Sequence, residues 1–104
     1  MGKINYHVDL SDGQGFFSGY ALNLSRFGLY LQDISKKIDH SAPLTVVISC
    51  EGQSFKMFTR ARWTEERKYM KDIGVEIINA PWGWTEFVMA REPNQDTSWT
   101  EIHQ

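Results

Sequence analysis

Six short segments of this chain have the composition of β-strands, and turn-forming residues separate most of them. The clearest is the β-branched run 44–49, which is followed by a break at Glu51-Gly52-Gln53. In 54–63, a mostly apolar set of residues alternates with a mostly polar set, as in a half-buried strand. The two runs therefore predict a hairpin. The six expected strands span residues 4–10, 16–24, 29–32, 44–49, 54–63 and 73–78.

The segments between these strands are mostly polar, and one helix is expected after the last strand. Residues 33–43 are expected to form a loop or at most one helical turn. Residues 64–72 carry six charges among nine residues, which is typical of a solvated connection. Asn79-Ala80-Pro81 indicates a helix start, because proline is tolerated in the first turn. A helix of about three turns is expected to follow, with these residues at helical spacing: Trp84, Phe87, Val88 and Arg91.

These elements predict a mainly β fold, a small six-stranded antiparallel β-barrel with a C-terminal α-helix. Residues 1–93 are expected to form a single domain, and 94–104 a polar C-terminal tail. The apolar share of 41% is enough for a core. The net charge of −2 argues against long nucleic acid as a partner, because nucleic acid demands a concentrated positive field.

Several kinds of chemistry find no support in the sequence. No apolar run approaches the roughly 18–20 residues that cross a bilayer, so no membrane insertion is expected. The single cysteine, Cys50, favours a cytoplasmic location. His7, His40 and His103 lack metal-ligand spacing, so neither a metal nor a cofactor is expected. No catalytic group of residues stands out, and the chain is not expected to be an enzyme.

A small-ligand pattern, Asn23-x-Ser25-x-x-Gly28, runs from the end of the second expected strand to the start of the third. Asn and Ser fold their side chains onto nearby backbone, and Gly accepts a positive φ. A tight turn here would leave polar groups beside exposed backbone N–H groups. The alternative is that these three residues simply make a strand-to-strand turn without a ligand.

The pattern resembles the Asn/Asp-x-Ser-x-x-Gly signature of PilZ domains, the bacterial receptors for cyclic di-GMP. Two further pieces agree in order and interval, the aromatic-ended strand 58–63 and the Gly-Val strand 73–77. The resemblance implies a six-stranded barrel with a cyclic di-GMP site on its outer rim. It also implies that Asn23 bonds a guanine edge, with Ser25 and the Gly28 backbone assisting. Arg26 lies inside the motif and is a candidate phosphate contact, or else a solvated surface arginine.

The sequence departs from the PilZ pattern upstream, where the family carries an Arg-x-x-x-Arg motif. No arginine precedes Asn23, and Lys3 cannot replace two forked guanidinium groups. Cyclic di-GMP binding is therefore expected to be weak or absent, unless the arginines come from elsewhere. Arg60 and Arg62 share one strand face and are candidate substitute cations, or else exposed residues facing acidic partners.

The resemblance also implies a signalling role through protein partners in motility, pilus or exopolysaccharide control. Two functions remain open, a nucleotide-responsive module and a nucleotide-independent adaptor. For the adaptor, Trp82 and Trp99 are the candidate partner surface, because exposed aromatic residues often anchor interfaces. Trp99 could instead fold back onto the barrel.

Overall fold

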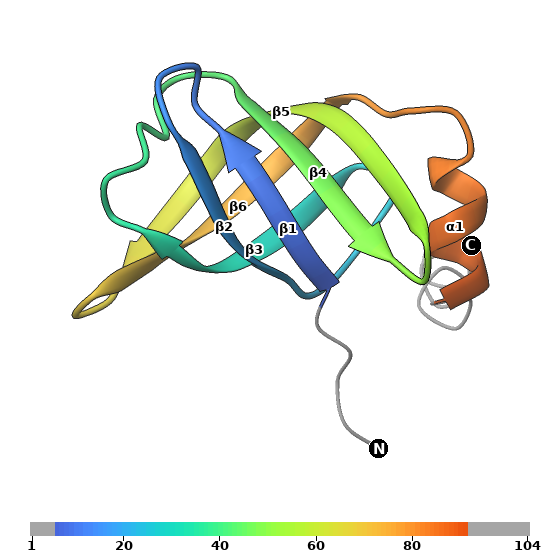
Figure 1. Cartoon of the computed structure of the whole chain (residues 1–104), viewed down its shortest axis with the longest axis horizontal. Helices are drawn as coiled ribbons and strands as arrows, with labels where there is room; N and C mark the ends of the chain where they lie inside the picture. Colours follow the sequence, from blue (N-terminus) through green and yellow to red (C-terminus); the bar gives the residue numbers. More distant parts are fainter. Residues whose placement is uncertain (1–5, 92–104) are drawn as a thin grey trace, which may run out of the picture.

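The computed structural model describes residues 6–91, which form a closed six-stranded antiparallel β-barrel and one α-helix (Figure 1). The strands follow the order β1-β2-β3-β6-β5-β4 around the barrel. This architecture confirms the expected fold class. The elements are β1 (Tyr6–Ser11), β2 (Phe16–Ala21), β3 (Gly28–Ser35), β4 (Leu44–Cys50), β5 (Gln53–Glu66), β6 (Met70–Asn79) and α1 (Trp84–Arg91).

The predicted hairpin between the fourth and fifth strands is confirmed. Cys50 pairs with Gln53, so two residues, Glu51 and Gly52, make the turn. Both have positive φ, 53° and 81°, as a tight hairpin turn of this type requires. Gly52 adopts this conformation without steric cost, and its turn fixes the register of the two strands.

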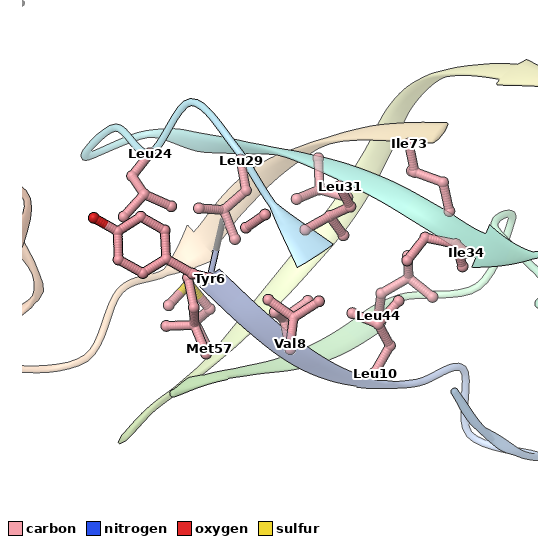
Figure 2. Packing of buried hydrophobic residues seen from close by; sticks show 14 of the residues in the cluster. Tyr6, Val8, Leu10, Leu24, Leu29, Leu31, Ile34, Leu44, Met57 and Ile73 are labelled. Atoms are coloured by element: carbon pink, nitrogen blue, oxygen red, sulfur yellow. The ribbon is translucent and has the colours of Figure 1, made fainter. Parts of the chain in front are cut away.

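The barrel interior is filled by alternate residues of the strands (Figure 2). Val8 and Leu10 of β1 point inward, and so do Leu29, Leu31 and Ile34 of β3. Period-two alternation places successive side chains on opposite faces, which separates the core from the outer surface. The other buried apolar residues of the strands are Tyr6, Ala21, Leu44, Val46, Ile48, Met57, Ile73 and Val75.

Helix α1 packs against the barrel through Trp84, Phe87 and Val88, all of which are buried. Phe55 of β5 contacts the rings of Trp84 and Phe87, with centroids 5.4 and 4.8 Å away. Within the described residues the helix has eight residues, about two turns, and it begins later than the sequence-based expectation. It starts late because the Trp84 amide donates to the Pro81 carbonyl in a preceding turn, in which Gly83 has a φ of 87°.

Two connections differ from the sequence-based expectation. β2 ends at Ala21 rather than at residue 24, and Leu24 lies buried in the connection that follows. The expected solvated connection 64–72 is wrong, because β5 runs on to Glu66 and β6 already begins at Met70. The physical reason is that β6 pairs with both β5 and β3, so its first residues lie between two strands. β3 is correspondingly longer than expected and reaches Ser35, with a bulge between Leu31 and Ile34.

Candidate functional site

The connection 22–27 joins β2 to β3 and carries the Asn-x-Ser-x-x-Gly pattern. The Ser25 hydroxyl closes it: Oγ accepts from the amides of Gly28 and Phe27, at 2.9 and 3.2 Å. Oγ also donates to the Gly28 carbonyl at 3.1 Å. Ser25 is therefore a turn-closing residue, and its hydroxyl is already engaged within the protein.

Gly28 is required for close approach of two backbones. Its φ is not positive, which corrects the expectation from the sequence. A Cβ at Gly28 would lie 2.8 Å from the carbonyl oxygen of Val75 on β6, a distance that forces movement of backbone. Glycine at this position thus allows β3 to begin directly against β6, where Gly28 pairs with Glu76.

Asn23, Arg26 and Phe27 are the exposed residues of the segment 23–28. The amide of Asn23 offers both a donor and an acceptor, which is the chemistry needed at a guanine edge. The Arg26 guanidinium lies over the Phe27 ring, 5.2 Å from its centroid. The rim of the connection therefore presents an amide, a guanidinium and an exposed aromatic ring.

The two candidate substitute cations lie on β5, across β6 from the motif. Gly28 and Arg60 both pair with Glu76, so they are separated by two strand spacings, about 10 Å. Arg62 is exposed and forms an ion pair with Glu76, with Nη1 and Oε1 3.3 Å apart. The cations are therefore near the motif, but a carboxylate stands between them and Gly28.

An aromatic pair lies next to these groups, in the row of paired residues Tyr30, Gly74 and Trp63. The rings of Tyr30 and Trp63 have centroids 5.3 Å apart. The indole lies over Gly74, since a Cβ there would be 2.2 Å from two of its ring atoms. Glycine on β6 thus provides the space in which Trp63 packs across the sheet.

A buried carboxylate in the same region was missed by the sequence analysis. Asp72 is fully buried, and its Oδ2 accepts from Tyr30 Oη at 2.9 Å and from Arg67 Nη2 at 2.6 Å. Burial by itself raises the pKa of the Asp72 carboxyl, but the hydrogen bonds from Arg67 and Tyr30 outweigh it and the pKa lies below its ordinary value. The sequence signal was the Arg67/Asp72 spacing, which is informative only once a hairpin is assumed.

The candidate partner residues separate into described and undescribed ones. Trp82 is 98% exposed, whereas Trp84 is buried in the core. Trp99 lies outside the described residues.

Within residues 6–91, no group of three His, Cys, Asp or Glu side chains could hold a metal ion. No helix in the same stretch is both long and apolar enough to span a membrane.

The closed six-stranded antiparallel barrel with one helix after the last strand is a PilZ-like fold. Among solved structures, the chain is similar to the Bacillus subtilis inhibitor of motility, MotI/DgrA, with a TM-score of 0.68. The two chains are 10% identical, and the likeness covers 89% of this chain and 49% of MotI/DgrA. The chain thus spans about half the length of that protein, and the likeness establishes the fold. No family model and no curated protein matches the sequence.

Proposed function

We propose that this protein is a PilZ-type bacterial signalling module of the cyclic di-GMP receptor family, with an incomplete nucleotide site and action through protein partners. The observation that carries the proposal is the position of the motif. In a PilZ-like barrel, the connection between β2 and β3 presents Asn23 and Arg26 at the rim. The fold shared with an inhibitor of motility supports a partner in motility control, with pilus or exopolysaccharide control as related outputs, in the cytoplasm.

The nucleotide part of the proposal depends on cations. Arg26 lies in the motif, and Arg60 and Arg62 lie on β5, close enough for one elongated dinucleotide to span the gap of about 10 Å between Gly28 and Arg60. Glu76 opposes an anionic ligand and holds Arg62. Without the upstream arginine pair, each missing charge-assisted hydrogen bond costs about 1.5–3 kcal/mol. Binding is therefore proposed to be weak or absent, with this protein's own cations giving any residual affinity.

A calorimetric titration with cyclic di-GMP tests this, with GMP as the control ligand. Binding that is lost in Asn23→Ala and in Arg26→Ala, while the unfolding transition stays unchanged, supports the nucleotide reading. Ser25→Ala is not a clean probe, because the hydroxyl closes the turn. If millimolar nucleotide gives no heat, the nucleotide part of the proposal is wrong and the adaptor function remains.

The second candidate function is a nucleotide-independent adaptor. The specific observation is Trp82, which is almost fully exposed just before α1, in contrast to the buried helix residues Trp84 and Phe87. A large exposed indole is the kind of residue that anchors a protein interface. An adaptor of this type loses its partner in Trp82→Ala or Trp99→Ala and keeps it in Asn23→Ala.

A further inference from the structure

The outer surface of β5 carries a run of cations with an aromatic residue among them. Lys56, Phe58, Arg60 and Arg62 are all exposed, and we call these four residues the β5 outer face. The chain as a whole has a net charge of −2, so this concentration of positive charge is local. An acidic partner segment is the complement of such a surface.

Most of this charge is not neutralised by the part of the chain that the structure describes. Arg62 pairs with Glu76, but within residues 6–91 neither Lys56 nor Arg60 forms an ion pair. The Lys56 ammonium lies 6.0 Å from the centroid of the Phe58 ring. Phe58 is 50% exposed, and Ile78 on the neighbouring strand is 51% exposed. The β5 outer face therefore offers apolar contact area as well as charge.

Helix α1 ends close to the start of this face. Arg91, its last residue, forms an ion pair with Glu51, with Nη2 and Oε1 2.7 Å apart. Glu51 belongs to the turn that leads into β5, and Figure 1 shows α1 beside this turn. The described part of the chain therefore ends, at Arg91, at the end of the barrel from which the β5 outer face begins.

The sequence after Arg91 has the composition that the β5 outer face would recognise. Residues 92–104 contain three acidic side chains and no Lys or Arg, together with two large apolar residues. The distance along β5 from Gln53 to Arg62 is nine residues, about 30 Å at 3.3 Å per residue. Thirteen extended residues cover that distance. The residues concerned are Glu92, Asp96, Trp99, Glu101 and Ile102.

We propose that residues 92–104 dock along the β5 outer face of the same chain. The acidic side chains lie against Lys56, Arg60 and Arg62, and the indole of Trp99 packs against Phe58 and Ile78. The proposal does not require that a nucleotide binds. It also occupies Arg60 and Arg62, so an anionic ligand that uses these arginines has to displace the segment.

A spin label tests the contact in the full chain. In a Cys50→Ser, Ser98→Cys variant, a nitroxide at residue 98 broadens the amide signals of nearby residues. We expect the signals of residues 56–62 to lose intensity relative to those of β2, which lies on the opposite side of the barrel. The broadening weakens in about 1 M salt, where the Debye length falls to about 3 Å. Equal intensities in β5 and β2 would overturn the proposal.

Matched charge variants decide whether the contact is specific. Neutralising the segment with Glu92→Gln, Asp96→Asn and Glu101→Gln is expected to remove the broadening of 56–62. Neutralising three exposed acids elsewhere, with Asp9→Asn, Glu65→Gln and Glu86→Gln, is expected to leave it in place. Broadening that survives the first set contradicts the proposal.

A mixing experiment detects a second copy of the chain as the occupant. Spin-labelled chain is mixed with ¹⁵N-labelled chain that carries no spin label, and broadening of the ¹⁵N-chain signals would overturn the intramolecular contact. None of these readouts depends on a nucleotide.

Discussion

The ammonium of Lys71 lies 2.8 Å from Nδ1 of His40, on a lysine that is only 2% exposed. Lys71 also donates to the carbonyl of Ile38 at 3.0 Å. Both acceptors belong to the loop between β3 and β4, so the buried cation ties this loop to the start of β6. A lysine ammonium has no acceptor lone pair, which means that Nδ1 of His40 is the acceptor and carries no proton.

This relationship predicts that His40→Ala destabilises the protein by about 1–3 kcal/mol, because a buried charged donor loses an acceptor. Denaturant unfolding measures the change. His7→Ala is the matched control: His7 is exposed and its Nδ1 lies 3.9 Å from Oδ2 of Asp9, so its loss is expected to cost less than about 0.5 kcal/mol. Equal effects of the two substitutions would contradict the assignment of His40.

Asp72 predicts how stability responds to acid. Its pKa is lowered in the folded state, so its contribution is complete well above the unfolded value of about 3.9 and is lost as pH falls below it. One titrating proton changes stability by up to about 1.4 kcal/mol per pH unit. We call this loss of stability at low pH the acid limb. Asp72→Asn is expected to flatten it in unfolding curves recorded between about pH 2 and about pH 6.

Asp12 makes a second, separate contribution to the acid limb. Its pKa is lowered chiefly by the amide of Asp39, then by those of Gln14 and Gly15, so it makes a separate acid-dependent contribution of the same sign. Asp12→Asn should therefore flatten the limb independently, and the double variant should combine both effects. A limb that Asp72→Asn leaves unchanged would mean that the Arg67 and Tyr30 bonds to Asp72 do not favour its ionised form.

The packing of Trp63 on Gly74 predicts a strong coupling between the two positions. Gly74→Ala places a methyl group within the indole and is expected to cost about 1–3 kcal/mol. In a Trp63→Ala background the same change should cost much less, since the three atoms nearest to the added methyl all belong to Trp63. A double-mutant cycle by denaturant unfolding gives the coupling energy. Additive effects would show that the added methyl group meets another obstacle.

The ion pair of Arg62 with Glu76 predicts a gain of nucleotide affinity on substitution. Glu76→Gln removes a carboxylate near the motif and frees Arg62, so cyclic di-GMP should bind about three- to tenfold more tightly, equivalent to roughly 0.7–1.4 kcal/mol. Calorimetry measures the change, with Glu86→Gln on α1 as a control that removes an equal charge. The same gain in both variants would assign it to net charge alone.

The two tryptophans Trp82 and Trp84 are predicted to differ strongly in what their substitution by alanine costs in stability. Trp84→Ala is expected to cost about 3–5 kcal/mol, because the indole is completely buried. Trp82→Ala should change the free energy of unfolding by less than about 0.5 kcal/mol, because that side chain is exposed. Thermal or denaturant unfolding separates the two. A destabilising Trp82→Ala would indicate that Trp82 packs on the protein rather than facing a partner.

The sequence predicted the barrel because strand signals are local. The β-branched run that became β4 and the alternation in β5 are each visible within ten residues, and the turn at Glu51 and Gly52 links them. The segment 64–72 could not be predicted in the same way. Its charges look solvated, and only the pairing of β6 with both β3 and β5 shows that Lys71 and Asp72 are buried.

The candidate site was predicted less completely than the fold. The predicted strands placed Arg26 between two strands and Asn23 at the end of the second one, whereas in the structure both are exposed in the connection between β2 and β3. The internal bonds of Ser25 and the contact that Gly28 makes with Val75 depend on three-dimensional neighbours, which no spacing reveals. The carboxylate of Glu76 between the motif and the β5 arginines depends on register in the same way.

The indole nitrogen of Trp84 donates to the carbonyl of Ser25 at 3.0 Å, which joins the core of α1 to the turn that carries the motif. A ligand that shifts this turn therefore changes the free energy of the contact between the turn and α1. By linkage, a partner that binds α1 changes the affinity of the turn for the ligand by the same factor as the ligand changes the affinity of α1 for the partner. One hydrogen bond thus couples the β2–β3 connection to α1.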